Sequence, residues 1–426
     1  MKRSILITTA EQGFKLIFQL LTVYLVARSV EPEAFGWSAL TTILISSLTL
    51  VTQIGIEPYL ISAANISQSR NDKVFTLVFL VSFLLFLSSI LISMLYISDF
   101  NLRVVLIGGS LGSFIWSTGA VSRAMLNRSE DFSEIAKIGV FSSILYFISS
   151  VSLANLQGSG TLALIGGQVI SIFGTSFLTI RASKLKVRFS LPRRVNVEAV
   201  HFFKNTGISG FSNFLARNLD SVLIYISLGV TSLAFYDRAY IIVLNIQLAL
   251  SQIFSRVFLP KFATHSGDLA AKYLSGLKIY AQFSMFLSTI SILFSDRIVT
   301  TLLSNGYEST ASLLPILAFG GFLQSLSSLS GVLLLSKRRT STLLKISGIS
   351  ALVYATAFLS VFLFSTSLLH YAFATCISAL VVLMIVMIYL PSTVDNLTLS
   401  NQLKCVLPSL ATVAVSFALS SYLNQH

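Results

Sequence analysis

Apolar stretches of roughly 20 residues recur along this whole chain, and only short polar segments separate them. A bilayer core about 30 Å thick needs roughly 20 apolar residues for each helical span. These runs are far too long for the strands of a membrane barrel, and an isolated segment in lipid satisfies its backbone hydrogen bonds only as a helix. Only 11% of the 426 residues are charged, whereas soluble domains contain about 25%. The sequence therefore predicts an all-α, polytopic membrane protein.

The apolar periodicity places thirteen membrane spans along the chain. They lie near residues 8–28, 37–60, 74–97, 103–122, 135–154, 160–180, 204–228, 233–258, 275–300, 310–335, 341–364, 368–390 and 404–423. The first is interpreted as a retained span because Glu11 and Lys15 interrupt its apolar region, which is unlike a secretory signal. The last follows the polar run 392–401, so a peripheral or partly inserted helix is the alternative there.

The distribution of basic residues predicts the orientation. Most of the 29 Lys and Arg residues fall in alternate loops, on the same side as Lys2 and Arg3. Cytoplasmic loops carry the excess of positive charge in membrane proteins, so the N-terminus is predicted to be cytoplasmic. The net charge of +13 then reflects topology beside anionic lipid headgroups, and we expect no nucleic-acid partner.

A basic linker around Pro192 divides the chain into two parts. The pair Ala34-Phe35 opens the second span, and Ala234-Phe235 opens the eighth in the same way. Six spans return the chain to its starting side, so the repeats would be parallel and related by a pseudo-two-fold axis along the membrane normal. The fold class is thus two six-helix lobes, with twelve core spans and a thirteenth. The predicted limits are 1–181 for the first lobe, 182–203 for the linker, 204–391 for the second lobe and 392–426 for the additional span.

Ionisable and amide side chains inside predicted spans are the candidate functional residues, because a charge at the centre of a span costs roughly 2.5 to 3.5 kcal/mol. The charged candidates are Glu11, Lys15, Glu57, Arg217, Asp220, Asp237 and Arg238. The amide candidates are Gln53, Asn213, Asn245 and Gln324.

Two interpretations of these charges remain open. Glu11 and Lys15, four residues apart, and Arg217 and Asp220, three apart, could neutralise each other and lock helices together. Asp237 and Arg238 could instead lie at the outer interface. The alternative is a hydrophilic passage, favoured because the charges fall on the first two spans of each half. Basic members would attract phosphate, and a buried carboxylate could carry a proton.

Several classes of function are excluded by missing motifs. The sequence has no Gly-x-x-x-x-Gly-Lys-Ser/Thr phosphate loop and no Gly-rich dinucleotide fingerprint, so ATP is not an expected partner. Cys376 and Cys405 lie in or beside apolar segments, which argues against a disulfide framework or a metal site. We expect no cofactor, no metal and no catalytic residues.

The second half of the chain resembles a known family in three stretches. They are Asn218 to Gly229, then Leu233 to Tyr240, and then Ser255 to Pro260. The segment from Ala27 to Gly36 matches the loop after the first span in the same family. On these motifs the chain is similar to Wzx-type polysaccharide exporters of the multidrug/oligosaccharidyl-lipid/polysaccharide exporter superfamily.

The resemblance implies a flippase for an undecaprenyl-pyrophosphate-linked polysaccharide repeat unit, such as an O-antigen unit of lipopolysaccharide, in the bacterial inner membrane. It also implies alternating access around a partly cationic cavity. Partners would be membrane lipids, H⁺ or a monovalent cation, and other polysaccharide-assembly membrane proteins. Lys15, Arg217 and Arg238 would attract the pyrophosphate. The hydrogen-bonding candidates for sugars are Asn213, Asn245, Gln53 and Gln324, and the ion-coupling candidates are Glu57, Asp220, Glu11 and Asp237.

Two other functions compete with this one. A multidrug or cation antiporter of the same superfamily would favour an acidic, aromatic cavity, whereas the embedded charges here are of both signs. A membrane polysaccharide polymerase or glycosyltransferase would need a long outer loop for its catalytic residues, and every predicted outer loop is short.

Overall fold

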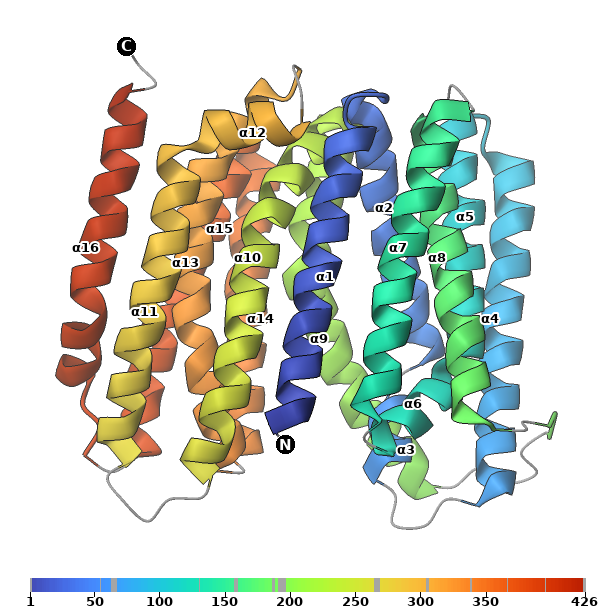
Figure 1. The fold of residues 1–426 in the computed structure, drawn as a ribbon, viewed down its shortest axis with the longest axis horizontal. Helices are drawn as coiled ribbons and strands as arrows, with labels where there is room; N and C mark the ends of the chain where they lie inside the picture. The colour runs from blue at the N-terminus through green and yellow to red at the C-terminus, as the bar shows by residue number, and fades with distance from the viewer. Residues whose placement is uncertain are drawn as a thin grey trace. The chain divides into compact units, whose positions relative to one another are not determined.

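In the part of the chain that the computed structural model describes, all the regular secondary structure is helical (Figure 1). It describes residues 2–53, 55–62, 67–129, 131–156, 160–185, 188–190, 197–263, 269–303, 306–337, 339–365, 367–394 and 396–423. The chain divides into two compact units, residues 1–214 and 215–426. The narrower limits given for the lobes, the linker and the additional span stay a prediction.

The described part of the first unit contains eight complete helices and the beginning of a ninth. They are α1 (Lys2–Val26), α2 (Pro32–Thr52), α3 (Ile56–Ser62), α4 (Gln68–Tyr96), α5 (Phe100–Thr118), α6 (Ala120–Arg128), α7 (Phe132–Leu156), α8 (Gly160–Ser183) and the first part of α9 (Val197–Leu228). Within this unit α7 packs against both α1 and α8, and α5 packs against α2, α4 and α8.

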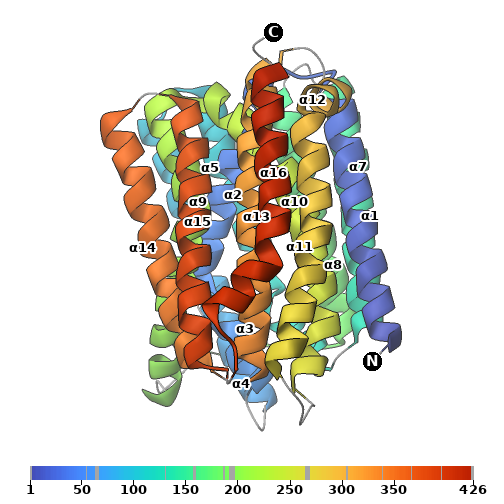
Figure 2. The ribbon, with the colours of Figure 1, turned by 90° about the vertical axis from the view of Figure 1, so that its left-hand side faces the viewer.

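The second unit contains the rest of α9 and the remaining helices. They are α10 (Val230–Ala263), α11 (Leu269–Leu293), α12 (Ser295–Leu303), α13 (Glu308–Ser336), α14 (Thr340–Phe364), α15 (Leu368–Tyr389), the short 3₁₀ helix η1 (Leu390–Ser392) and α16 (Leu399–Leu423). Helix α13 is central, since it packs against α10, α11 and α15. Helix α16 packs mainly along α11, as Figure 2 shows.

Capping residues explain where several of these helices begin. The Ser67 hydroxyl accepts a hydrogen bond from the Arg70 amide at 3.3 Å and so caps α4. The Asp99 carboxylate accepts one from the Leu102 amide at 2.7 Å and caps α5. Short polar side chains satisfy the free amides of a first helical turn in this way. Pro32 at the start of α2 loses no hydrogen bond, because that amide has no partner within the helix.

Among the described residues, ten helices are long and apolar enough to cross a membrane. They are α2, α4, α5, α7, α8, α11, α13, α14, α15 and α16. The fold is therefore that of a multi-pass membrane protein, as predicted. Helices α1, α9 and α10 are 25, 32 and 34 residues long and contain the candidate charges, and their assignment as spans stays a prediction.

Two predicted spans of the first unit are interrupted. In the segment 37–60, helix α2 ends at Thr52 and helix α3 begins at Ile56. Gly55 lies between the two helices and has a φ of 65°. In the segment 103–122, helix α5 ends at Thr118 and helix α6 begins after Gly119. A positive φ is costly for residues other than glycine, so Gly55 allows the first of these turns.

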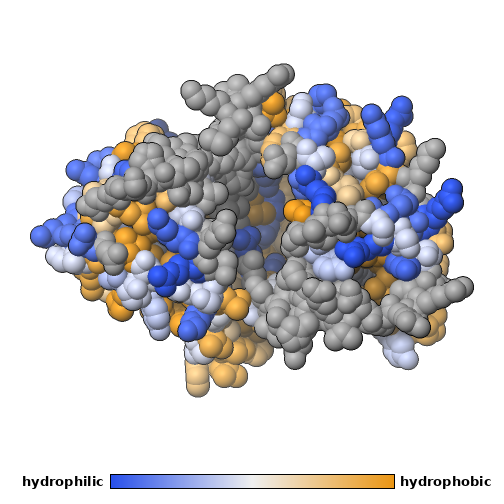
Figure 3. Space-filling model, turned by 90° about the horizontal axis from the view of Figure 1, so that it is seen from below, coloured by the Kyte–Doolittle hydropathy of each residue, from blue (hydrophilic) through white to orange (hydrophobic). Residues whose placement is uncertain are grey.

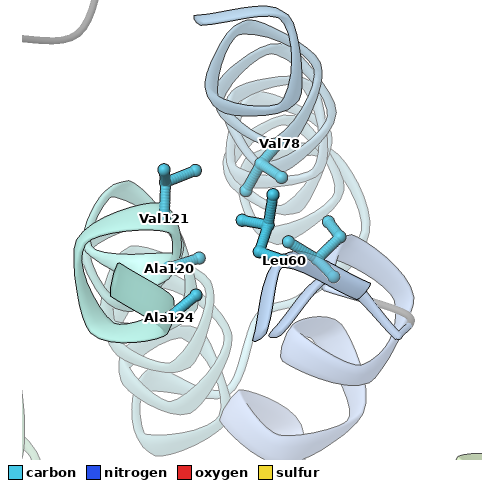
Figure 4. Packing of buried hydrophobic residues seen from close by; sticks show 6 residues of the cluster. Leu60, Val78, Ala120, Val121 and Ala124 are labelled. Carbon is cyan, nitrogen blue, oxygen red and sulfur yellow. The ribbon is translucent and has the colours of Figure 1, made fainter. Parts of the chain in front are cut away.

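The two short helices α3 and α6 pack together through a small apolar cluster (Figure 4). Leu60 of α3 lies against Ala120, Val121 and Ala124 of α6, and Val78 of α4 completes the contact. Figure 3 views the end of the molecule at which α3 and α6 lie, and hydrophilic side chains are frequent on that face.

The helix observed in place of the predicted span 275–300 begins and ends earlier in the sequence than expected. Helix α11 ends at Leu293, and residues 295–303 form the separate helix α12. Asp296 and Arg297 lie in the first turn of α12, and these charges favour an interface over the bilayer core.

Candidate functional site

Among the described carboxylates of the second unit, Asp220 on α9 is the most buried. Its side chain is only 4% exposed. Its Oδ2 accepts a hydrogen bond from the hydroxyl of Tyr236 at 2.8 Å, and its Oδ1 accepts one from the amide of Ser221 at 2.7 Å. The Ser221 hydroxyl lies 3.4 Å from the same Oδ1. A buried charge or acid requires such partners, because burial without them costs several kcal/mol.

The hydrogen bonding continues from Tyr236 into α15. The Tyr236 hydroxyl lies 2.9 Å from Oγ1 of Thr375, and that oxygen lies 3.0 Å from the backbone carbonyl of Tyr371. The Tyr371 hydroxyl lies 3.2 Å from Oγ of Ser227, which returns to α9. Side chains of α9, α10 and α15 thus form one polar cluster, which we name the Asp220 cluster: Asp220, Ser221, Ser227, Tyr236, Tyr371 and Thr375.

Sequence reasoning identified Asp220 and missed the other members of the Asp220 cluster. Tyr236 and Tyr240 are four residues apart on α10, and their rings stack with centroids 6.0 Å apart. This i, i+4 spacing in an apolar helix was the available signal. Thr375 gave none, because single Thr residues are frequent in membrane helices and bond to their own backbone.

Of the two interpretations left open for Arg217 and Asp220, the structure does not show the ion pair. Arg217 is exposed on α9, and the three ion pairs of the described residues do not include Asp220. The carboxyl group bonds to Tyr236 and Ser221 instead.

Asp237 and Arg238 form an ion pair on α10. Arg238 Nη2 lies 2.5 Å from Asp237 Oδ2, and the side chains are 10% and 17% exposed respectively. A guanidinium group so placed makes strong, charge-assisted hydrogen bonds. The exchange of its carboxylate partner for a phosphate would keep the positive charge neutralised.

In the first unit Glu11 and Lys15 pair along α1, as their spacing predicts. Lys15 Nζ lies 2.5 Å from Glu11 Oε1, with Glu11 4% exposed and Lys15 37% exposed. The pair rests against Gly139 of α7, where an added Cβ would meet Lys15 Nζ at 2.7 Å. The ammonium group therefore has a buried partner on one side and a partly open approach on the other.

Gln53 takes part in a second polar group of this unit, at the helix interruptions. Its Nε2 donates to Ser117 Oγ at 3.2 Å, and its Oε1 accepts from Arg123 Nη2 at 3.3 Å. The same Nη2 donates to the carbonyl of Trp116 at 2.8 Å, and the guanidinium lies 3.7 Å from the Trp116 ring centroid. These contacts link the end of α2 to α5 and α6.

Arg123 lies one residue beyond the predicted span 103–122, and the structure places it in the short helix α6. Burial lowers the pKa of Arg123 to about 10, and the negative charge of Glu57 acts in the opposite direction. The guanidinium therefore stays protonated at neutral pH. Glu57 accepts a hydrogen bond from the Asn127 side chain, so it belongs to this contact between α3 and α6.

The other three amide candidates provide less evidence about the site. Gln324 is exposed on α13. The side chains of Asn213 and Asn245 lie outside the described part of the structure. No group of three His, Cys, Asp or Glu residues that could hold a metal ion occurs in the described chain.

Comparison with known proteins adds evidence on the family. A family model described as "Polysaccharide biosynthesis protein" matches residues 25–312. The chain is 27% identical over 222 residues to the teichuronic acid biosynthesis protein TuaB of Bacillus subtilis (strain 168). That match covers 50% of this chain and 45% of TuaB, which is about half of each protein.

Solved structures resemble the fold over nearly the entire chain. The lipid II flippase MurJ in an inward closed conformation has a TM-score of 0.73 and 17% identity, over 96% of this chain and 92% of MurJ. An inward-facing multidrug resistance MATE family transporter of the MOP superfamily has a TM-score of 0.66 and 14% identity, over 92% and 96%. At these identities the likeness shows a shared fold.

Proposed function

Because the chain belongs to the polysaccharide biosynthesis protein family, we propose that it is a flippase that moves an undecaprenyl-pyrophosphate-linked polysaccharide repeat unit across the bacterial inner membrane. The repeat unit would pass from the cytoplasmic to the periplasmic leaflet by alternating access, and the N-terminus would be cytoplasmic. The observation that carries the proposal is the family match together with a fold shared with a lipid II flippase over 96% of the chain. Membrane lipids and other polysaccharide-assembly membrane proteins are the proposed partners.

The pyrophosphate would be attracted by Lys15, Arg217 and Arg238. Lys15 and Arg238 are each held by a carboxylate, at 2.5 Å in both cases. A pyrophosphate offers more negative charge and more acceptor oxygens than one carboxylate, so it can replace Glu11 or Asp237 as the partner. Lys15 and Arg238 would then each have a negatively charged partner both before and after the substrate binds.

Sugar hydroxyls would bind to the amides Gln53, Gln324, Asn213 and Asn245. Gln53 supports this role through its position at the interruption of α2, beside the hydroxyl of Ser117. Amides offer both donors and acceptors, which suits the hydroxyls of a sugar.

Ion coupling would use Asp220, Glu11, Asp237 or Glu57. Asp220 is the strongest of these, because it is buried and its bonding partners are neutral hydroxyl and amide groups. The other three carboxylates each have a nitrogen-bearing side chain as partner. A carboxylate without a permanent cation is free to bind and release an ion.

The direct test is reconstitution into vesicles with a labelled undecaprenyl-pyrophosphate oligosaccharide. We expect Lys15→Ala and Arg217→Ala proteins to translocate the lipid at least tenfold more slowly than wild type, which is about 1.4 kcal/mol of lost stabilisation. Lys137→Ala is the matched control, since Lys137 also pairs with a Glu, at 2.6 Å, but on an exposed surface. Wild-type rates in both correctly inserted variants would contradict the cationic role.

A multidrug or cation antiporter is the second candidate, and the likeness to a MATE family transporter favours it. Vesicles that contain no lipid-linked glycan distinguish the two functions. Efflux of a cationic dye from such vesicles, with no translocation of lipid-linked oligosaccharide in the parallel assay, would support the antiporter.

A further inference from the structure

Part of the linker that follows α8 docks onto the first turns of α4. The Arg188 amide donates to Asp72 Oδ1 at 3.0 Å, and the Ser190 amide donates to Thr76 Oγ1 at 2.8 Å. Asp72 and Thr76 are buried and lie four residues apart, so they share one face of α4. Two backbone hydrogen bonds to buried side chains therefore fix the course of residues 188–190, which we name the docked segment.

Phe189 is the middle residue of the docked segment, and its ring lies on aromatic side chains of α4. The ring centroids of Phe75 and Phe79 lie 5.6 Å and 5.2 Å from that of Phe189, both in edge-to-face contact. Phe189 is nevertheless 66% exposed. Leu77 and Leu80 of α4 are exposed as well, and α4 is one of the helices long and apolar enough to cross a membrane. The uncovered face of the Phe189 ring is therefore open to lipid.

The length of α4 indicates the depth at which the docked segment lies. Its 29 residues extend over about 43 Å at about 1.5 Å per residue, whereas a hydrocarbon core is about 30 Å thick. The polar run 68–73 opens the helix, and the long apolar part begins at Val74. The first turns of α4 thus belong at the level of the lipid headgroups. Hydrogen bonds to Asp72 and Thr76 place the docked segment at the boundary between headgroups and acyl chains.

Exposed basic side chains lie at the same level. Lys73 of α4 and Arg188 of the docked segment are both exposed. Leu185 packs on the apolar cluster of α3, α6 and α4, so the exposed Lys184 before it is held near this end of α4. None of the three ion pairs of the described residues includes these cations. Positive charge beside an apolar ring at headgroup level is complementary to an anionic lipid.

We propose that the docked segment and the start of α4 form a binding site for anionic phospholipids of the leaflet on the predicted cytoplasmic side. Lys73, Lys184 and Arg188 bind the phosphate oxygens, and the ring of Phe189 lies against the first carbons of the acyl chains. Arginine offers paired N–H donors to a phosphate, and lysine offers a compact charge. The site does not depend on which substrate the protein moves, so it stands apart from the proposed flippase function.

A tryptophan at position 189 reports the lipid contact directly. Full-length protein with Trp37→Phe and Trp116→Phe contains no other tryptophan, and Phe189→Trp adds one in the docked segment. The protein is reconstituted in mixtures of phosphatidylglycerol and phosphatidylcholine in which one of the two lipids is brominated. Bromine quenches tryptophan emission only at close range, so quenching across the mixtures gives the relative binding of the two lipids. We expect phosphatidylglycerol to be preferred at least about threefold.

Leu363→Trp in the same tryptophan-free background is the matched control. Leu363 is 69% exposed, nearly as much as Phe189, and it lies on α14. The segment 346–394 around it contains no Lys, Arg, Asp or Glu. We expect quenching at position 363 with no preference for phosphatidylglycerol. Equal preferences at positions 189 and 363, or no quenching at position 189 by either lipid, would overturn the proposal.

Removal of the three cations tests the source of the preference. In the Phe189→Trp protein, the combined changes Lys73→Gln, Lys184→Gln and Arg188→Gln should abolish the preference and leave quenching by phosphatidylcholine in place. The control removes three exposed lysines of the second unit: Lys278→Gln, Lys345→Gln and Lys404→Gln. This control should keep the preference at position 189. A preference that survives the first set of changes would contradict the site.

Thr76→Val tests whether docking holds the cations at this depth. The change removes the acceptor of the Ser190 amide, so the preference at position 189 should fall. Thr76→Ser keeps the hydroxyl and should retain it. An unchanged preference in Thr76→Val would contradict the role of the docked segment in building the site.

Discussion

The second and fourth long helices differ between the two units. In the first unit they are α2, 21 residues long, and α5, 19 residues long, and each is followed by a short separate helix, α3 or α6. In the second unit they are α10, 34 residues long, and α13, 29 residues long, and both continue without a break. The second and fourth long helices are therefore interrupted in the first unit and continuous in the second.

The side chains at these helices also differ, because they are charged in the first unit and neutral in the second. The interruptions of the first unit surround a cation, Arg123, which bonds to Gln53 and to the carbonyl of Trp116. The continuous helices of the second unit are joined by neutral groups. Gln247 of α10 donates to Ser288 at 3.0 Å and accepts from Ser284 at 3.0 Å, and Ser284 lies 2.6 Å from Ser325 of α13. Where these helices are continuous, hydroxyls and an amide make the contacts between them.

Arg123→Ala should produce the largest loss of stability in this comparison. The change removes a hydrogen bond to the carbonyl of Trp116, a bond to Gln53 and a cation–π contact of 3.7 Å. The hydrogen bond to the Trp116 carbonyl contributes roughly 1.5 to 3 kcal/mol and the cation–π contact about 1, while the long 3.3 Å bond to Gln53 adds little, so we expect a loss of about 3 kcal/mol. Thermal unfolding in detergent measures it.

Tryptophan fluorescence gives the control for Arg123→Ala. The chain has two Trp residues, Trp37 and Trp116, so a Trp37→Phe background isolates the residue that Arg123 covers. Emission from Trp116 should change in Arg123→Ala. If both emission and unfolding temperature match wild type, the interruptions do not depend on this cation.

Gln247→Leu should have a smaller effect in the second unit. Ser284 and Ser288 lose a buried partner, although both can turn toward the backbone of their own helix. Hydrogen bonds between membrane helices average about 0.6 kcal/mol, so two of them give about 1.2 kcal/mol. The measurement is the same thermal unfolding assay.

Gln168→Leu is the matched change in the first unit. The Gln168 side chain of α8 donates to Ser38 Oγ of α2 at 2.7 Å, so it also joins two long helices. Similar losses for Gln247→Leu and Gln168→Leu are expected if both units use amides in the same way. A loss in Gln247→Leu as large as that in Arg123→Ala would remove the distinction between the charged and the neutral junctions.

The sequence predicted the fold well because the hydrophobic signal is strong and local. Each of the ten membrane helices matches a predicted span within a few residues at most ends. The interruptions were missed because a backbone turn at Gly55 and a break at Gly119 do not lower the hydrophobicity of their segments. The similar apolar content of 37–60 and 233–258 concealed one broken helix and one continuous helix.

The sequence predicted the contacts of the candidate site within one helix and missed those between helices, because its signal is local. Pairs within one helix, such as Glu11 with Lys15, follow from spacing alone and are present. The Asp220 cluster joins α9, α10 and α15, so its members Tyr236 and Thr375 lie on other helices than Asp220 and no spacing within one helix relates them. The spacing within α9 allowed Arg217 as the partner of Asp220, but in the structure Asp220 bonds to Tyr236 of the neighbouring helix α10.

Gly139→Ala should have the smallest effect, and it tests the fifth long helix of each unit. An added methyl group on α7 would meet Glu11 Oε1 and Lys15 Nζ, whereas at Gly348 of α14 nothing lies within 4 Å. The two contacting atoms end flexible side chains, so we expect a loss of only about 1 kcal/mol in Gly139→Ala. Gly348→Ala should gain about 0.5 kcal/mol from helix propensity, and opposite shifts in unfolding temperature would show this. Equal shifts would mean that α1 and α7 separate easily enough to accept the methyl group, and that the Glu11–Lys15 pair does not depend on their close packing.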